Sequence, residues 1–589
     1  MSAFISMFPL RLALCLGLAF SLGAKAPQVL LNHLGFDPSS SKQAVLQSPL
    51  DLGSPTFSLV DASGKSVFEG PCKGAGPIDH WHTGRTWLAD FSSFDHPGTY
   101  RVRVNLPKKA SLSEPFTIQS RLIPETCVPP LIDYFRSQHC AGVYDRTDRN
   151  VRFFGSRSGR ADVHGGWYDA SGDQSKYLSH LCYTNYLSPQ QTPLVVWALL
   201  EACHRFESAK GERLPAMAPR ILEEALYGAD FLTRMRDPEG YFYLSITDVW
   251  THDPDQRFIC AFSDGNGTKS EKYRASFRDG AGLAIAALAR ASREKMHGDF
   301  TQAQYLSAAE KGFAHLLEHN REYLYNGQEN LTDDYSALLA ATELCATTSK
   351  PQYLEVAREL AGRMIRRQVK EGAWPGRFLC DDTGRPYFHA AEAGLPVVAL
   401  LRYREVETHA LRRELVLKAV QNYFEFEMKL TQSVPNSFGY ARQVVRDLGG
   451  EPRAAFFFPH KNESTYWWQG ENARLASLAA AARWAAPLMP PQMQAPLRAH
   501  ATRQLDWILG ANPYDVCMLQ GKGRNNPDYL PAWPNVLGGV CNGITAGFED
   551  ESDIAFLPNP QGQDPAHNWR WSEQWIPHAG WLMLALSVE

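Results

Sequence analysis

The hydrophobic pattern of this chain changes near Leu122, and that change limits the fold more than any other feature. From residue 27 to about residue 120, apolar and polar residues alternate in short segments separated by turn sequences such as Asp61-Ala62-Ser63-Gly64. Short strands spaced roughly 8–12 residues apart predict a β-sandwich of the immunoglobulin type. After Leu122 apolar residues recur at helical spacing over about twelve long segments, which predicts a helical domain.

We therefore expect a multidomain protein, with an all-β immunoglobulin-like sandwich over residues 27–120 and an all-α domain over residues 125–589. About twelve helices joined by loops of uneven length favour a closed (α/α)6 toroid over an open arrangement. A superhelical solenoid is the alternative, but it would show a repeat of fixed period, which is not visible in the sequence.

Residues 1–26 have the pattern of a secretory signal peptide. Arg11 precedes an apolar run from Leu12 to Leu22, and small residues follow, with Ala24-Lys25-Ala26 as a cleavage candidate. The run is too short to span a bilayer, so we expect a secreted or periplasmic protein without a membrane span. The formal net charge of -4 gives no indication of a nucleic-acid partner.

The first candidate site is the segment His164–Leu181, which reads HGGWYDASGDQSKYLSHL. It places Asp169 and Asp173 in a glycine-rich loop, which we expect to lie just before a helix. Two neighbouring carboxylates can hold a water molecule and remove its proton, whereas helix capping would explain only one of them. Trp167 and Tyr168 of the same loop are candidate substrate contacts.

The second candidate site is Glu573, which lies in the segment NWRWSEQWIPHAGW among three tryptophans. At the start of the last predicted helix, the helix dipole would lower its pKa. Burial against Trp569, Trp571 and Trp575 would raise that pKa, as a general acid requires. The prediction that Glu573 acts as an acid therefore requires its carboxyl group to be poorly solvated.

Two further loops supply candidate substrate contacts. Trp467 and Trp468 lie in a polar loop and could form a flat platform for a sugar, with Glu471 beside them. For Glu471 the alternative is the first turn of the next helix. Arg524 lies in a turn-rich loop and could contact hydroxyl groups.

The sequence contains no motif for catalysis by a serine nucleophile or by a zinc ion. There is no G-x-S-x-G elbow for a serine nucleophile and no H-E-x-x-H motif for a zinc site. We expect no required cofactor and no catalytic metal, and the sequence leaves open a structural calcium ion in one of the acidic loops.

Four motifs, in order along the chain, resemble glycoside hydrolase family 9 in the subgroup with an N-terminal immunoglobulin-like cellulase domain. They are VLLNHLGFDP, GGWYDASGDQSKY, LDWILGANPYD and WSEQWIPHAGW, and the resemblance covers about residues 28–589. It implies that Asp173 is the general base, that Asp169 helps to hold the attacking water, and that Glu573 is the general acid. It also implies hydrolysis with inversion at the anomeric carbon.

Two departures from the family pattern bear on the substrate. Asp169 and Asp173 are four positions apart because Ser171 is added, and this spacing leaves open which of the two is the base. The stretch GRNNPDYLPAWPN lacks the His-His-Arg-like cluster typical of endoglucanases. In both respects the chain resembles a divergent branch that includes exo-acting enzymes such as exo-β-glucosaminidases.

These observations predict a secreted inverting hydrolase of β-1,4-linked glucan-type polysaccharides or oligosaccharides. The main alternative is an exo-β-D-glucosaminidase that acts on chitosan oligosaccharides. A carbohydrate-binding protein without catalysis would lack one of the three carboxyl groups, and none is missing. A polysaccharide lyase would use Tyr with His or Arg in a basic cleft, which neither the paired aspartates nor the net charge favours.

Overall fold

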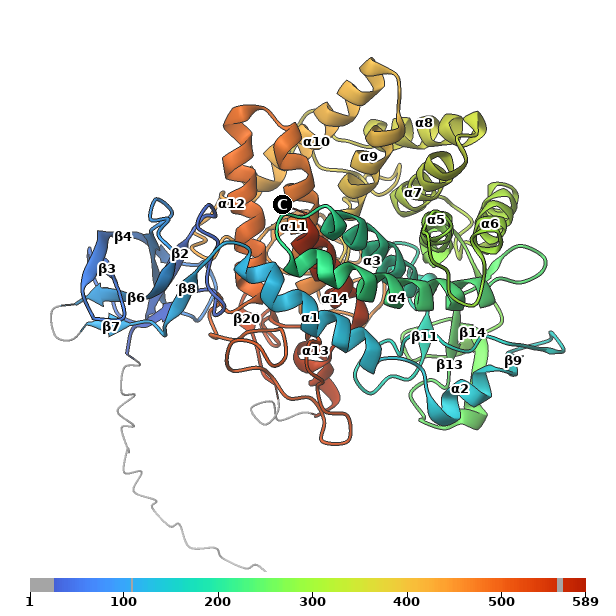
Figure 1. Cartoon of the computed structure of the whole chain (residues 1–589), viewed down its shortest axis with the longest axis horizontal. Helices are drawn as coiled ribbons and strands as arrows, with labels where there is room; N and C mark the ends of the chain where they lie inside the picture. The colour runs from blue at the N-terminus through green and yellow to red at the C-terminus, as the bar shows by residue number, and fades with distance from the viewer. Residues whose placement is uncertain (1–25, 107–109, 559–564, 589) are drawn as a thin grey trace, which may run out of the picture.

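The computed structural model describes residues 26–106, 110–558 and 565–588, so the predicted signal sequence lies outside the described residues except for Ala26. Within these ranges the chain forms a β-sandwich beside a much larger helical body (Figure 1). Both parts agree with the change of hydrophobic pattern near Leu122.

The sandwich is built from eight antiparallel strands in which inward-facing apolar side chains alternate with outward-facing polar ones. Strands β1 to β8 pair in the order β1-β2-β5-β4-β3-β6-β7, and β8 pairs with β6. Their buried side chains, including Leu46, Leu59 and Val102, form a separate small core. The strands are β1 (Gln28–Leu30), β2 (Gln43–Ser48), β3 (Thr56–Val60), β4 (Ser66–Pro77), β5 (Arg85–Asp90), β6 (Gly98–Asn105), β7 (Ser111–Leu112) and β8 (Phe116–Ile118).

In the described ranges the helical body contains twelve helices of ten residues or more, together with the short α2 (Gly142–Asp148) and α13 (Trp569–Ser572). Six of the long helices form an inner ring in which each contacts the next: α3 (Thr192–Glu207), α5 (Gly282–Ala291), α7 (Leu331–Thr348), α9 (Leu395–Val406), α11 (Asn472–Ala485) and α14 (Ile576–Ser587). The other six lie outside: α1 (Leu122–Ser137), α4 (Arg213–Arg234), α6 (Gln302–Tyr323), α8 (Pro351–Arg366), α10 (Ala410–Thr431) and α12 (Pro491–Ile508).

Sequence pattern explains which helices lie inside. Every residue of α5 is buried, and α14 has no exposed residue either. The outer α8 is amphipathic: Tyr353, Ala357 and Leu360 face inward while charged residues face solvent. Because α14 contacts both α11 and α3, the last inner helix closes the ring on the first, and Figure 1 shows α14 among them. The helical body is therefore an (α/α)6 toroid, as predicted.

Short strands lie in the loops between the helices, in the connections after α2, α4, α10 and α12. They are β9 (Val151–Phe153), β10 (Arg160–Ala161), β11 (Lys176–Tyr177), β12 (Phe242–Tyr243), β13 (Ser245–Thr247), β14 (Phe258–Phe262), β15 (Lys269–Ser270), β16 (Arg274–Ala275), β17 (Gln443–Arg446), β18 (Pro452–Ala455), β19 (Thr545–Ala546) and β20 (Ile554–Ala555).

The expectation of a helix directly after Asp173 is wrong. Residues Lys176–Tyr177 instead form β11, which pairs with β13, and the next α-helix begins only at Thr192. Lys176 is fully buried, with its ammonium group 2.8 Å from Asp148 and bonded to the carbonyl oxygens of Val163 and Gly165. These tertiary contacts require an extended backbone here and outweigh local helical preference.

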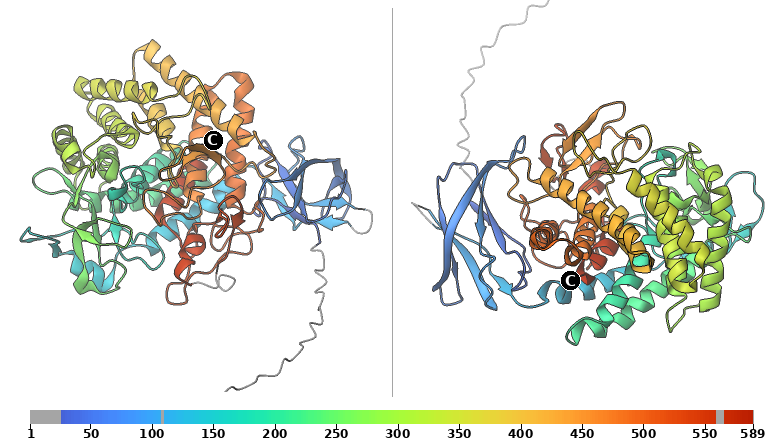
Figure 2. Two further views of the ribbon diagram at one scale, coloured as in Figure 1. Left: turned by 180° about the vertical axis from the view of Figure 1, so that it is seen from behind. Right: turned by 90° about the horizontal axis from the view of Figure 1, so that it is seen from above.

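The sandwich packs against the toroid through apolar and polar contacts. Trp81 lies 4.8 Å from Phe456 and 6.2 Å from Trp507, ring centre to ring centre, and belongs to the toroid's hydrophobic core. Asn32 donates a hydrogen bond of 2.9 Å to the buried Asp506. Figure 2 shows the sandwich in contact with one side of the toroid.

No helix among the described ranges is both long and apolar enough to cross a membrane. The ten cysteines that these ranges contain are free thiols, and all except Cys345 are buried.

A cluster of ionic side chains joins the C-terminal ends of the inner helices. The fully buried Glu343 of α7 contacts Arg290, Arg293 and Arg402 at distances between 2.5 and 3.2 Å. Burial alone would raise the pKa of Glu343, but the charges of the three arginines outweigh it and hold that pKa well below the ordinary value of 4.5.

We predict that Glu343→Gln lowers the free energy of unfolding by about 3–5 kcal/mol, because Arg290, Arg293 and Arg402 lose the buried carboxylate that they share. Glu201 still pairs with Arg290, and Glu405 still pairs with Arg402. Since the folded-state pKa is depressed, the loss should be present above pH 4.5 and shrink as the pH falls. Urea denaturation at several pH values measures it. The matched control is Glu405→Gln, whose carboxylate is 40% exposed beside Arg402 and should cost below about 1 kcal/mol.

Candidate active site

A cavity of about 370 Å³ opens at the N-terminal ends of the inner helices α3 and α14 and holds three carboxyl groups. Its walls are mostly aromatic, which suits a ligand with flat apolar faces and polar edges. The residues that line it are Asp169, Ala170, Ser171, Gly172, Asp173, Tyr177, His180, Trp250, His252, Gly265, Tyr466, Trp467, Gln469, Tyr529, Leu530, Trp533, Trp569, Glu573 and Trp575.

The loop that carries both aspartates is tightly folded around Gly172. This glycine has a φ of 78°, a left-handed conformation that other residues rarely adopt. An added Cβ would lie 3.2 Å from the ring of Trp533, so the position also has little room. The loop is joined to the opposite side of the cavity, because Ser171 donates its N–H to the carbonyl of Gln574 at 2.9 Å.

Asp169 is nearly inaccessible and is held at both carboxyl oxygens. Gln191, directly before α3, donates to Oδ1 at 2.6 Å, and Trp575, directly before α14, donates to Oδ2 at 3.0 Å. Burial and the nearby charge of Asp173 raise the pKa of Asp169 well above its ordinary value, against the effect of these two donors. Asp169 therefore ties the first inner helix to the last.

Asp173 lies at the cavity surface with only 8% of its area exposed. The N–H of Ser175 donates to Oδ1 at 2.8 Å. The indole of Trp250 donates to Oδ2 at 3.0 Å, and the hydroxyl of Tyr177 donates to the same oxygen at 3.3 Å. These donors fix the orientation of the carboxylate.

Glu573 lies between α13 and α14, three residues before α14 begins. Its Oε2 accepts a hydrogen bond of 3.3 Å from Asn542, whose own Oδ1 is 2.7 Å from His578. Burial raises the pKa of Glu573 well above 4.5, and the charges of Asp173 and Asp169 raise it further. Glu573 is half-buried, and the direction of its pKa shift is the one that a general acid requires.

Of the other predicted contacts, Trp467 lines the cavity and the remaining six do not. Trp167 is fully buried and packs on Phe135 and Tyr227, so it has no surface to offer a substrate. Tyr168 points away from the cavity and its hydroxyl contacts the backbone of Ala141.

The four others serve packing or the interface between domains. Glu471 is buried and paired with Arg474, as its alternative helix-start role suggested. Trp468 stacks on His460 with ring centres 3.6 Å apart. Trp571 is also buried, and its indole donates to Thr545.

Arg524 pairs with Asp515 at 2.6 Å, and Asp515 also contacts His33 of the sandwich at 3.0 Å. This position ties the turn-rich loop to the sandwich rather than offering a guanidinium group to the cavity. The loop itself reaches the cavity further along, at Tyr529 and Trp533.

Sequence reasoning missed a group of aromatic wall residues. Trp250 and His252 come from the loop after β13, and Tyr529 and Trp533 from the turn-rich loop. The two loops meet where His252 stacks on Trp533 with ring centres 4.6 Å apart. The unusual length of both loops was the available signal, but it does not identify which residues face inward.

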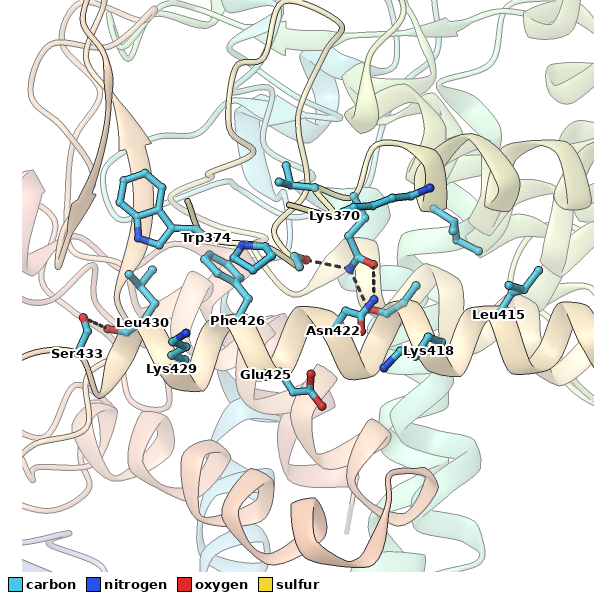
Figure 3. Close-up of a pocket in the computed structure, with 16 residues that line it drawn as sticks. Lys370, Trp374, Leu415, Lys418, Asn422, Glu425, Phe426, Lys429, Leu430 and Ser433 are labelled. Atoms are coloured by element: carbon cyan, nitrogen blue, oxygen red, sulfur yellow. Dashed lines mark hydrogen bonds between the residues drawn. The ribbon is translucent and has the colours of Figure 1, made fainter. Parts of the chain in front are cut away.

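A larger groove of about 560 Å³ lies elsewhere, between α10 and the loop after α8 (Figure 3). Trp374 and Phe426 form its apolar part, and Lys370, Lys418 and Lys429 surround it. Among the described residues that line it, Glu425 is the only one with a carboxylate, so these residues offer no pair of acidic groups for proton transfer. The smaller cavity is therefore the candidate active site.

The arrangement of sandwich and toroid is shared with solved glycoside hydrolases. A metagenome-derived glycoside hydrolase family 9 endoglucanase matches with a TM-score of 0.63 and 20% identity, over 95% of this chain and 98% of that one. A family 9 structure from Bacteroides ovatus matches with a TM-score of 0.65 and 19% identity, over 95% and 98% of the two chains. These likenesses define the class of fold.

Sequence comparison gives the family. Residues 131–531 match glycosyl hydrolase family 9, and residues 24–109 match the cellulase N-terminal Ig-like domain. The chain belongs to glycosyl hydrolase family 9 and is an O-glycosyl hydrolase, so the resemblance inferred from the four motifs is confirmed. A curated relative, the xyloglucan-specific endo-β-1,4-glucanase BoGH9A of Bacteroides ovatus, is 25% identical over 580 residues, covering 91% of this chain and 86% of the relative.

We predict that Glu573→Gln stabilises the protein relative to wild type, and increasingly so as the pH rises above 4.5. The raised pKa means that the folded state keeps a proton that the unfolded state loses above this pH, so wild-type stability falls as the pH rises, whereas glutamine stays neutral. Thermal unfolding of both proteins across a pH series measures the difference. The control is Glu371→Gln, which removes an exposed carboxylate. A difference for Glu573→Gln that does not change with pH would contradict the prediction.

Proposed function

We propose that this enzyme hydrolyses β-1,4-linked glucan-type polysaccharides or oligosaccharides with inversion at the anomeric carbon. Glu573 is the general acid, Asp173 is the general base, and Asp169 helps to hold the attacking water. The observation that carries the proposal is that Glu573, with its raised pKa, shares one cavity with the two aspartates although 400 residues separate them in sequence.

The chemistry needs two carboxyl groups in opposite protonation states. Glu573 donates its proton to the glycosidic oxygen as the bond from that oxygen to the anomeric carbon breaks. Water attacks the same carbon from the opposite face, and Asp173 accepts the proton that this water loses. Every proton transfer is assigned to a carboxyl group, so the proposal needs no cofactor.

The walls of the cavity support a sugar as the substrate. Trp467, Tyr466, Trp533 and Trp569 present flat rings on which the apolar faces of pyranose rings can stack, and Gln469 offers an amide for hydroxyl groups. The family 9 relative from Bacteroides ovatus is a xyloglucan-specific endo-β-1,4-glucanase, which supports a β-1,4-glucan as the class of substrate.

An exo-β-D-glucosaminidase acting on chitosan oligosaccharides is the second candidate. It is favoured by the charge of the cavity: the described residues that line it include three carboxyl groups and no lysine or arginine. Such a cavity attracts the ammonium group of a glucosamine unit. Hydrolysis rates on cello-oligosaccharides and chitosan oligosaccharides of equal length distinguish the two candidates.

We also infer that the enzyme is secreted or periplasmic. The signal pattern of residues 1–26 supports this inference, as does a polymeric substrate that would be met outside the cell.

We predict that Asp173→Ala and Glu573→Gln each lower kcat by about 10²–10⁴-fold, the usual contribution of a general acid or base. Release of reducing sugar from cellulose, xyloglucan, chitosan and their oligosaccharides measures it, with circular dichroism to confirm folding. The control Glu371→Gln removes an exposed carboxylate outside the cavity and should retain wild-type rates. Near-normal rates for both catalytic variants would refute the assignment.

We also predict that the first product released from a β-linked oligosaccharide is the α-anomer, since water attacks opposite the departing oxygen. Proton NMR spectra recorded during the first minutes, before mutarotation, identify the anomer. Initial release of the β-anomer would instead require a covalent intermediate and would refute the assignment of Asp173 as a base.

A further inference from the structure

The loop that follows β13 has an unusual backbone beside the cavity. Val249, Trp250 and His252 have φ values of 55°, 59° and 57°. Left-handed backbone is unfavourable for residues with a Cβ, and for a β-branched residue such as Val249 it is rare. Strained conformations of this kind persist only where surrounding contacts impose them, and they concentrate at functional sites.

Several contacts impose this conformation. Thr247 accepts a hydrogen bond of 2.8 Å from the N–H of Val249, and the hydroxyl of Tyr144 donates to the carbonyl of His252 at 3.0 Å. The ring of His252 stacks on Trp533, and its Nδ1 is 2.6 Å from Oε1 of Gln174. The segment is thus fixed at both ends.

Packing from the far side also depends on this conformation. A Cβ added to Gly267 would lie 2.5 Å from Val249 and 2.8 Å from the indole of Trp250. Only a glycine at this position lets the indole lie where it does. The ring also packs against Phe262 of β14, with ring centres 5.8 Å apart.

The result of these constraints is one directed hydrogen bond. The indole N–H of Trp250 lies 3.0 Å from Oδ2 of Asp173. Ser175 already holds Oδ1, so Trp250 completes the fixation of the carboxylate. Tyr177 is a weaker second donor to Oδ2, at 3.3 Å.

We propose that Trp250 is a positioning residue, which holds the carboxylate of Asp173 in the orientation that removes a proton from the attacking water. The strained segment 249–252 serves to bring the indole N–H to Oδ2. This inference rests on the proposed role of Asp173 as the base. Trp250 lies in a loop outside the four sequence motifs, so those motifs do not identify it.

The test uses the full-length enzyme and two substrates, cellotetraose and 4-nitrophenyl β-cellobioside. The nitrophenolate leaves without help from an acid, so a defect on the acid side is relieved by this substrate, whereas a defect on the water side persists. Trp250→Phe keeps an aromatic ring but removes the N–H donor.

We expect Trp250→Phe to lower kcat by about 10-fold or more on both substrates, as a misplaced catalytic group does, with KM within about twofold of wild type. Glu573→Gln should in contrast regain rate on the nitrophenyl substrate. An unchanged kcat for Trp250→Phe, a loss confined to cellotetraose, or a change in KM alone would overturn the proposal. If Trp250→Phe does not fold, Gly267→Ala, which displaces the indole without replacing it, is judged by the same criteria.

A second measurement needs no substrate. In protein labelled with ¹⁵N at tryptophan indoles, the Trp250 signal is assigned by its absence from Trp250→Phe. We expect it to move upfield in Asp173→Ala, because the N–H loses its carboxylate acceptor; an unmoved signal overturns the proposal. Wild-type inactivity on both substrates would count against the proposed function on cello-oligosaccharides, while the NMR result would still decide whether Trp250 holds Asp173.

Discussion

The rest of the site depends on the removal of three neighbouring carboxyl groups from water. Burial and the charges of neighbouring carboxylates raise the pKa of both Asp169 and Glu573 above their ordinary values. Asp173 has the best set of hydrogen-bond donors at the cavity surface, whereas Glu573 has one weak donor. This difference in hydrogen bonding is consistent with the proposal that Asp173 accepts a proton and Glu573 donates one.

Closure of the toroid brings these groups together. Asp169 accepts one hydrogen bond from the residue before α3 and another from the residue before α14, so it spans the seam where the ring closes. Ser171 and Gln574 join the same two segments through their backbones. At the other end of the inner helices, Glu343 and its arginines connect α5, α7 and α9. The sandwich contacts the loop after α12 through His33, which is bonded to Asp515.

The sequence predicted the architecture and the three carboxyl groups because both leave strong local signals. The change from two-residue to helical periodicity marks the two domains, and glycine-rich or tryptophan-rich segments mark the acidic residues. The residues that line the cavity were predicted poorly. Trp167 and Trp571 were expected to contact substrate but lie in the core, whereas Trp250 and Trp533 line the cavity and were not predicted. A tryptophan in an irregular loop has no periodicity to show which way it faces, and only the folded contacts decide. The extended segment after Asp173 was also not predicted, because it too depends on a contact made only in the folded chain, the ion pair between Lys176 and Asp148.

The place of α14 in the inner ring has a consequence for biosynthesis. Residues 122–508 can emerge from the ribosome and begin to pack as helical hairpins, yet the wall that α14 supplies is still missing from them. Until residues 569–587 follow, the acidic loop has no partner across the seam, and Asp169 lacks its donor from Trp575. A chain that stops before residue 569 therefore lacks one of the six inner helices and also Glu573, so its cavity is incomplete.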